Sequence, residues 1–258
     1  MKDKIKELCK KIEKENNVKI LFAIENGSRA WRMESEDSDY DVRFVFVRPL
    51  KEYLKIGTPR DVITCAFDKD GVPCKVEGSF IDLSGFDVFK FVRLLSKSNP
   101  TCIEWLISDI VYHGSQNKVF KKFALEKFNP MALYYHYKSS CKNNYMKYLS
   151  SRNLVTHKKY LYAFRGLINA KWVVNKNTVP PIVFLEAVEG LGDKIPVKIV
   201  SKLKEIIKLK SSGKEKDNVP NIVFMDDYIE AFLLEDLDFE KRKVDVSMLD
   251  DELQRILL

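Results

Sequence analysis

The stretch from Gly27 to Val47, which reads GSRAWRMESEDSDYDVRFVFV, constrains the fold more than any other part of the chain. It places five carboxylates between Glu34 and Asp41, although the chain as a whole is basic, with a net charge of +7. Like charges at this density repel one another unless water surrounds them or a cation gathers them. The stretch therefore predicts either a solvated loop or a cation site.

The last two carboxylates, Asp39 and Asp41, stand at the start of an apolar run that predicts a strand. Side chains two residues apart in a strand point to the same face. We therefore expect both carboxylates on one face of a sheet and Val42, Phe44 and Phe46 on the other. Hard divalent cations prefer carboxylate oxygens. The pair outlines a metal site that needs a third carboxylate and a phosphate-bearing ligand.

The segment just upstream supplies a candidate phosphate-binding turn. Residues 19–24 are apolar and predict a buried strand, which Gly27 and Ser28 follow closely. Gly27 has no Cβ to keep a ligand at a distance, and Ser28 adds a hydroxyl donor and a preference for helix starts. Backbone N–H groups at a helix start favour anions. A Gly-Ser pair alone is common in turns, but one placed between two such strands is much more specific.

Two acids further along the chain are candidates for the third carboxylate. Residues 61–67 and 74–83 predict the arms of a β-hairpin. Asp82, at the far end of the second arm, would lie across from the first two carboxylates if the strands are neighbours, because paired strands are about 4.8 Å apart. Alternatively, Asp82 only caps the helix that is expected to follow, and Glu77 is the second candidate for the site.

The remaining pattern predicts a mixed sheet flanked by helices, followed by an all-helical domain, and hence the α+β class. Asn129 and Pro130 mark the expected boundary, because proline is favoured in the first turn of a helix. Residues 1–129 would form the domain that contains the sheet, and residues 130–258 a helical domain. The sequence also predicts an edge strand at 110–113 and helices at 2–16, 86–97, 100–106, 115–127, 131–150, 156–174, 182–190, 197–210, 222–235 and 246–257.

Two predicted helices of the second half combine basic and aromatic residues. Lys138 and Lys142 lie among tyrosines, which suits base stacking and phosphate contacts with RNA. Alternatively, the tyrosines simply pack their helix. Lys158, Tyr162 and Arg165 form a stripe apart from the apolar face of the next helix, which suits a triphosphate or an acceptor backbone. The alternative for this stripe is a solvated face.

Composition narrows the class of protein. Hydrophobic residues make up 45% of the chain and charged residues 31%, as in globular proteins that fold in water. The five cysteines are scattered without C-x-x-C spacing, which argues against a disulfide framework or a zinc site. No apolar run approaches membrane-spanning length and no leader pattern precedes Ile5, so we expect a cytoplasmic protein without a membrane partner.

The pattern G-S-x(10)-D-x-D resembles the DNA polymerase beta superfamily of nucleotidyltransferases. The fuller string GSRAW…SDYDVRF is similar to a narrower branch, the RlaP/YcgL type of predicted nucleotidyltransferases. Three later stretches fit the same branch. They are Ile81-Asp82-Leu83, Lys97-Ser98-Asn99-Pro100 with Glu104-Trp105-Leu106, and Lys158-Lys159-Tyr160-Leu161-Tyr162 with Arg165. The resemblance runs from about Val18 to about Trp172. One departure is Arg32, where the family pattern has a glycine.

The resemblance implies a pyrophosphate-releasing nucleotidyltransferase with two Mg²⁺ or Mn²⁺ ions held by Asp39, Asp41 and Asp82. Residues 1–129 would then be its catalytic domain, and the helical domain of residues 130–258 would bind acceptor and nucleotide. Its substrate would be a nucleoside triphosphate, expected to be ATP, and its acceptor the 3′ end of an RNA, a tRNA in a repair setting. The implied nucleotide-binding residues are Gly27, Ser28, Arg29, Lys159, Tyr160 and Arg165. The candidates for nucleic-acid binding are Lys138, Lys142, Lys158 and Tyr162.

Two other functions stay open at this point. One is the same transfer to a hydroxyl of a protein or a small molecule, as in minimal nucleotidyltransferase toxins and antibiotic-modifying enzymes. The other is a non-catalytic module that binds RNA or nucleotide. The three carboxylates argue against the second alternative, and the basic helical half favours nucleic acid over a small acceptor.

Overall fold

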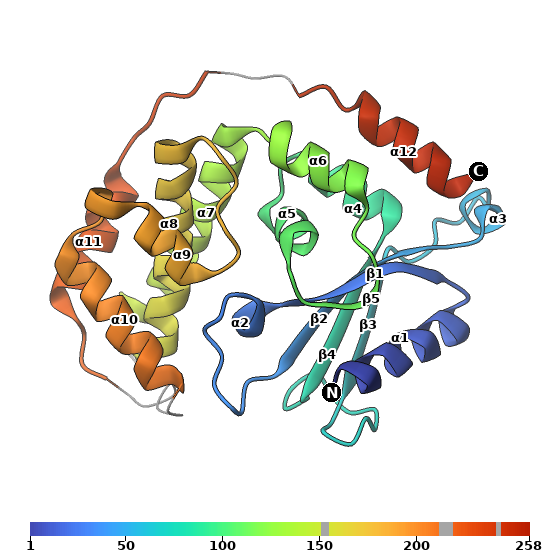
Figure 1. Ribbon diagram of the computed structural model, residues 1–258, viewed down its shortest axis with the longest axis horizontal. Helices are drawn as coiled ribbons and strands as arrows, with labels where there is room; N and C mark the ends of the chain where they lie inside the picture. Colours follow the sequence, from blue (N-terminus) through green and yellow to red (C-terminus); the bar gives the residue numbers. More distant parts are fainter. Residues whose placement is uncertain (151–154, 212–218, 241–243) are drawn as a thin grey trace. The chain divides into compact units, whose positions relative to one another are not determined.

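The computed structural model describes residues 1–150, 155–211, 219–240 and 244–258 (Figure 1). The chain divides into two compact units. The first comprises Met1–Ala30, Ser38–Phe128 and Val244–Leu258, and the second comprises Trp31–Asp37 and Asn129–Lys243. The division between Phe128 and Asn129 lies next to the boundary expected from the sequence, but the loop 31–37 and the last helix each belong to the other unit.

A five-stranded mixed sheet forms the centre of the first unit, with the strand order β3-β4-β2-β1-β5. Strands β2 and β4 are parallel, and all other neighbouring pairs are antiparallel. The α+β class expected from the sequence is confirmed. The strands are β1 (Lys19–Asn26), β2 (Tyr40–Val47), β3 (Val62–Phe67), β4 (Ile81–Asp87) and β5 (Val111–Gly114).

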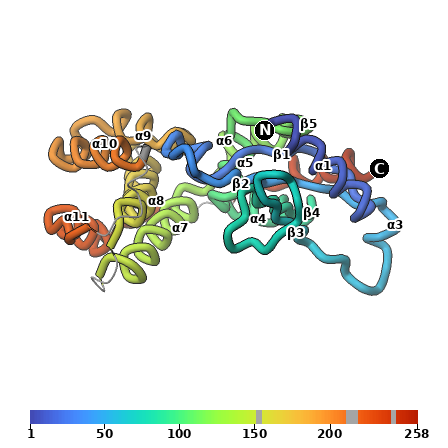
Figure 2. The backbone as a smooth tube through the Cα atoms, turned by 90° about the horizontal axis from the view of Figure 1, so that it is seen from below, coloured from blue at the N-terminus to red at the C-terminus, as the bar shows by residue number. Residues whose placement is uncertain are grey.

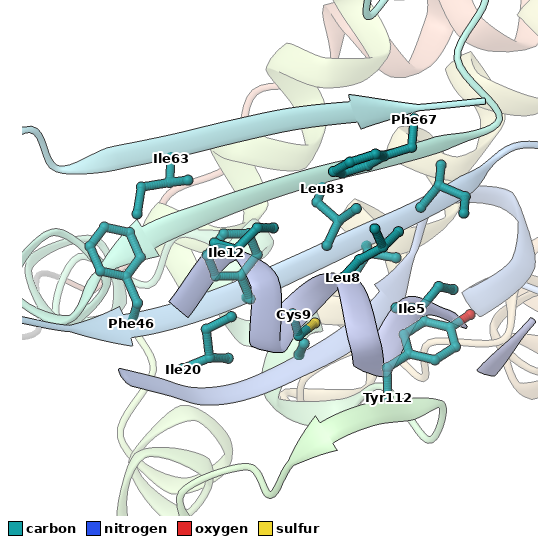
Figure 3. Close-up of a cluster of buried hydrophobic side chains, with 14 of the residues drawn as sticks. Ile5, Leu8, Cys9, Ile12, Ile20, Phe46, Ile63, Phe67, Leu83 and Tyr112 are labelled. Atoms are coloured by element: carbon teal, nitrogen blue, oxygen red, sulfur yellow. The ribbon is translucent and has the colours of Figure 1, made fainter. Parts of the chain in front are cut away.

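The first helix covers one face of this sheet (Figure 3). Its residues Ile5, Leu8 and Ile12 are buried at the helical spacing that the sequence shows, and Cys9 is buried beside them. They pack against the face of the sheet that carries Val42, Phe44 and Phe46. Since alternate residues of a strand point to opposite faces, Asp41 and Arg43 lie on the face away from this helix.

Helices α4, α5 and α6 cover the other face (Figure 1). Phe91 of α4 is the centre of an aromatic cluster, with ring centroids 5.9 Å from Phe22 and 6.0 Å from both Trp105 and Phe120. Helix α12 packs against α4 and α6. The helices of this unit are α1 (Lys2–Asn16), α2 (Gly27–Ala30), α3 (Leu50–Tyr53), α4 (Val88–Leu95), α5 (Pro100–Ile107), α6 (Lys118–Glu126) and α12 (Ser247–Leu257).

The second unit is helical, and Figure 2 shows α8 between α10 on one side and α11 on the other. Leu161, Phe164 and Ile168 of α8 are buried, as their spacing predicts. Within the described ranges, no helix is long and apolar enough to cross a membrane. The elements are α7 (Pro130–Asn144), the π-helical turn η1 (Tyr145–Leu149), α8 (His157–Lys176), α9 (Phe184–Gly190), the 3₁₀ turn η2 (Gly192–Lys194), α10 (Val197–Ser211) and α11 (Val223–Leu234).

Strand β4 differs from its prediction. The sequence predicts the second hairpin arm at residues 74–83 and a helix that begins at Phe86, but the strand runs from Ile81 to Asp87. Gly85 lies inside this strand. A glycine is required there because a Cβ would come within 2.1 Å of the Phe44 ring. The glycine therefore marks a close approach of two strands and not a break. As a result Asp82 is the second residue of its strand and not near the last.

Candidate active site

Asp41 and Asp82 lie side by side in the sheet. The parallel ladder between β2 and β4 pairs them directly in register. One nitrogen of Arg43 contacts both carboxylates, with Nη2 3.0 Å from Asp41 Oδ1 and 2.9 Å from Asp82 Oδ2. The expectation that Asp82 meets the first pair of acids thus holds for Asp41. The alternative role of Asp82 as a helix cap does not, because Asp87 is the residue whose side chain accepts from the first turn of α4.

Asp39 precedes β2 and is exposed. The Arg29 guanidinium fixes the backbone there, since Nη2 donates to Ser38 O at 2.6 Å and Nε to Asp39 O at 3.2 Å. The same group lies 4.0 Å from the centre of the Tyr40 ring. Across the part of the chain that the structure describes, no group of three His, Cys, Asp or Glu residues is placed to hold a metal ion. The metal role of Asp39 therefore stays a prediction.

Gly27 lies directly under the carboxylate of Asp41. Its φ angle is +65°, a left-handed conformation that L side chains rarely adopt, and a Cβ built on it would be 2.0 Å from Asp41 Oδ2. No other residue fits this position without moving Asp41. Ser28, the next residue, is buried. The Gly-Ser turn and the carboxylate pair therefore form one tightly packed structure.

Glu25 is a buried carboxyl group behind this pair, with no exposed surface. Its Oε1 accepts from the backbone N–H of Asp41 at 2.9 Å, and its Oε2 accepts from the Tyr112 hydroxyl at 2.5 Å. Burial raises the pKa of Glu25 to about 7, against the smaller lowering effect of these two hydrogen bonds. Because Glu25 holds the backbone of Asp41, it links the end of β1 to the start of β2.

The donor set fits a divalent ion of the Mg²⁺ type. Asp82 Oδ1 is buried and has no hydrogen-bond partner among the described residues, which is unfavourable for a carboxylate oxygen unless a cation or donor reaches it. Mg²⁺ is typically held in proteins by one or two carboxylates together with the phosphates of a substrate. Asp41 and Asp82 meet that requirement. Glu77, the second candidate for the third carboxylate, is exposed and lies outside the strands.

The predicted nucleotide-binding residues of α8 have partners within the helical unit. The Arg165 guanidinium lies 3.7 Å from the centre of the Trp31 ring, and Tyr162 meets the same ring edge-on at 5.6 Å. Tyr160 is buried, and its hydroxyl donates to Asp226 Oδ1 at 2.8 Å. Lys159 lies 4.9 Å from the centre of the Tyr148 ring. Nucleotide contacts for Arg165, Tyr160 and Lys159 stay predictions, as does RNA contact for Lys158 and Tyr162.

Lys138 and Lys142 line a groove of about 520 Å³ between α7, η1 and α11. Lys138 is partly committed to packing, because its ammonium donates to Glu235 O and lies within 6 Å of the Tyr134 and Phe232 ring centres. Lys142 is exposed. Nucleic-acid binding by the two lysines stays a prediction, and the groove gives it a defined location.

Sequence reasoning missed Glu25, Arg43 and Tyr112. Two of them carried a readable signal, because each is an ionisable residue inside an apolar strand. Glu25 ends the run KILFAIE, and Arg43 stands two residues after Asp41 on the same strand face. Tyr112 carried none, because its contact with Glu25 depends on the pairing of β5 with β1.

Comparisons with known proteins place the chain in a family. A family model described as "RlaP: RNA repair pathway DNA polymerase beta family" matches residues 1–258. The uncharacterized protein YcgL of Bacillus subtilis (strain 168) is 34% identical over 261 residues, which cover 100% of this chain and 95% of YcgL. A nucleotidyltransferase-like protein from Exiguobacterium sibiricum 255-15 aligns over 97% of this chain and 80% of its own at 13% identity, with a TM-score of 0.32, too low to support an argument. Since the family model and YcgL both extend over the whole chain, the protein belongs to the RlaP family, the DNA polymerase beta family of an RNA repair pathway.

Proposed function

We propose that this protein is a Mg²⁺-dependent nucleotidyltransferase that transfers the nucleoside monophosphate of ATP to the 3′-terminal hydroxyl of an RNA, a tRNA in a repair setting. Membership of the RlaP family supports a nucleotidyltransferase-like function in an RNA repair pathway. The observation that carries the proposal is the pairing of Asp41 with Asp82, directly over the left-handed Gly27.

In this proposal the two paired carboxylates hold a divalent ion, and Asp39 completes the set for a second ion. Mn²⁺ would serve as well as Mg²⁺, since both accept oxygen ligands. Such ions neutralise the charge of a triphosphate and lower the pKa of an acceptor hydroxyl. Glu25 and Arg29 keep the backbone of β2 in place, through Asp41 N–H and the carbonyls of Ser38 and Asp39 respectively.

The proposed reaction is an in-line displacement at the α-phosphorus of ATP. The oxygen of the acceptor hydroxyl forms the new bond to phosphorus, its proton passes to solvent, and the bond to the β-phosphate breaks, so that pyrophosphate leaves. Such a transfer depends mainly on positioning and charge neutralisation. The residues near Asp41 supply a rigid frame for it. Gly27 and Ser28 are the proposed contacts for the triphosphate, together with Arg29.

A nucleic-acid acceptor is favoured over a small molecule by the charge of the chain, which is +7. The groove between α7, η1 and α11 is lined by the exposed Tyr135 as well as by Lys142. An aromatic ring beside an ammonium group suits an unpaired base and its phosphate.

The test is a labelling reaction with each α-labelled nucleoside triphosphate, Mg²⁺ and total tRNA, followed by separation by size. The wild-type chain should label tRNA with ATP. Oxidation of the 3′-terminal diol of the tRNA with periodate should abolish the labelling, because the acceptor hydroxyl is then lost. Asp41→Asn and Asp82→Asn should each reduce labelling at least about a thousandfold, because each removes a charge from the proposed metal ligands.

Three results would contradict parts of the proposal. Unchanged labelling by Asp41→Asn or Asp82→Asn would contradict the proposed metal site. Unchanged labelling of oxidised tRNA would contradict the 3′ end as the acceptor. Label that appears on the protein or on a small molecule would support transfer to those acceptors instead.

A further inference from the structure

Arg43 is held by four acceptors around the carboxylate pair. Nη2 bridges Asp41 Oδ1 and Asp82 Oδ2. Nη1 donates to two backbone carbonyls, Val42 O at 3.0 Å and Asp82 O at 3.1 Å. The side chain is only 18% exposed, so the guanidinium is largely removed from water at this position.

The arrangement follows from the register of the sheet. Because Asp41 and Asp82 are direct neighbours on parallel strands, their carboxylates would repel each other if both were ionised. Arg43 lies on the same face two residues further along β2, and its planar fork brings one positive charge to both acids. The protein thus supplies its own cation to the two carboxylates that are proposed to bind a metal ion.

We propose that Arg43 is an internal counter-cation that a divalent ion displaces from Asp41 and Asp82, so that Arg43 sets the affinity of the site for metal. The proposal rests on the metal-dependent function proposed above. An ion held by Asp41 and by Asp82, whose Oδ1 has no partner among the described residues, would lie close to the guanidinium nitrogen that contacts the same two carboxylates, and like charges at this distance repel. Metal binding therefore opposes the contacts of Nη2, and the affinity for metal includes the cost of weakening two charge-assisted hydrogen bonds.

The test is a titration of the metal-free protein with Mn²⁺, in which the signal of free Mn²⁺ is followed by electron paramagnetic resonance. Arg43→Gln removes the competing charge and should bind Mn²⁺ about tenfold or more tightly than the wild type. Arg48→Gln is the matched control, because Arg48 lies next to the end of β2 and donates to Arg60 O instead of to the carboxylate pair. It should change the affinity by less than about twofold, as expected for loss of one distant charge.

The tighter Mn²⁺ binding of Arg43→Gln must come from the paired carboxylates Asp41 and Asp82. Adding Asp82→Asn to Arg43→Gln should therefore abolish the tighter binding. If Arg43→Gln binds Mn²⁺ no more tightly than the wild type, or if the gain survives Asp82→Asn, the proposal is wrong.

A second measurement observes the unaltered chain, and a variant serves only to assign the signals. The guanidinium nitrogens of Arg43, assigned by comparison with Arg43→Lys, are observed by nuclear magnetic resonance. Rotation about the Nε–Cζ bond should be faster at saturating Mg²⁺ than in the metal-free protein, because the contacts of Nη2 are lost while Nη1 keeps its two backbone acceptors. Rotation that is no faster at saturation would overturn the proposal.

The failure of this inference can be told apart from the failure of the proposed function. A chain that shows the predicted Mn²⁺ affinities but labels no RNA would support the role of Arg43 and contradict the transfer. A chain that labels RNA, but whose Arg43→Gln variant gains no affinity, would support the transfer and contradict the role of Arg43.

Discussion

Glu25 is an acid whose ionisation opposes folding. Its carboxyl group is fully buried, and its pKa is raised from 4.5 to about 7, chiefly because burial penalises the charged form. The native state therefore keeps the proton of Glu25 over a range of pH in which the unfolded chain has already lost it. Where the native state binds more protons, the free energy of unfolding falls as the pH rises.

This linkage predicts a pH window. Below about pH 4.5 Glu25 is protonated in both states, and the penalty is absent. Between about pH 4.5 and 7 stability should decline, by up to about 3 kcal/mol for a shift of this size, and above pH 7 the loss is complete. Glu25→Gln has no proton to lose, so its stability relative to the wild type should rise by a similar amount across the window. Urea unfolding in EDTA from pH 4.5 to 8 measures both curves.

The control for this prediction is Glu77→Gln, which removes a carboxylate from an exposed position. Its difference from the wild type should not follow the curve of Glu25→Gln. Parallel pH profiles for the wild type and Glu25→Gln would mean that the pKa of Glu25 is the same in the native state as in the unfolded chain.

For individual residues, the sequence predicts the chemistry of a side chain better than it predicts which groups that side chain contacts. The two-residue spacing of Asp39 and Asp41 locates the start of β2 to within a residue. The neighbour of Asp41 depends on the register between β2 and β4, which are separated by more than thirty residues of chain. Asp82 gained its support from a family resemblance, and Arg43 was missed, because spacing along one strand does not reveal which oxygens its guanidinium reaches.

The loop from Trp31 to Asp37 is the element that joins α2 to β2, and it belongs to the helical unit. The Trp31 ring holds it there, through its contacts with the Tyr162 ring and the Arg165 guanidinium. Arg32 follows with a φ of 56°, the left-handed conformation that glycine adopts freely. Arg32 therefore adopts a backbone conformation that a glycine would favour at this position.

This conformation predicts an order of stability among variants of Arg32. Arg32→Gly and Arg32→Ala both lose the arginine side chain, so that their difference isolates the backbone. A left-handed L residue costs about 1–2 kcal/mol, and glycine loses about 0.5–1 kcal/mol more than alanine in entropy on folding. Arg32→Gly should therefore be more stable than Arg32→Ala by roughly 1 kcal/mol in urea unfolding. An alanine variant as stable as the glycine variant would show that the turn is not left-handed in solution.

Elements with a clear period were predicted well. The helix at 2–16 and the strands at 19–24, 41–47 and 61–67 differ from α1, β1, β2 and β3 by two residues or fewer at each end. The error at β4 has a physical cause, since Ser84 and Gly85 resemble a helix start, whereas the ring of Phe44 requires a residue without a side chain at position 85. Such a close approach of two strands leaves no mark in the local pattern.

At the scale of the whole molecule, the net charge of +7 predicts salt-dependent RNA binding. On single-stranded RNA, each lysine that contacts a phosphate contributes about 0.7 to the slope of log K against log salt. Lys142→Ala, which removes an exposed charge from the groove between α7, η1 and α11, should lower the magnitude of that slope by about 0.7. Fluorescence anisotropy with a labelled single-stranded RNA at several salt concentrations measures it.

Lys10→Ala provides the comparison, because Lys10 is exposed on α1 and outside the groove. It should leave the slope nearly unchanged. Equal slopes for the wild type and Lys142→Ala would place the RNA elsewhere on the protein.

The order of the two units along the chain has a consequence for dissecting the protein. The chain leaves the sheet unit at Trp31, returns at Ser38, leaves again at Asn129 and returns at Val244. A gene truncated after Phe128 would encode a sheet without α12, whose Glu252 accepts from Asn117 at the start of α6. A gene begun at Asn129 would encode helices without the indole on which Arg165 stacks. Each truncation would uncover surfaces that the intact chain buries, so we expect both fragments to be less stable than the same segments within the whole protein.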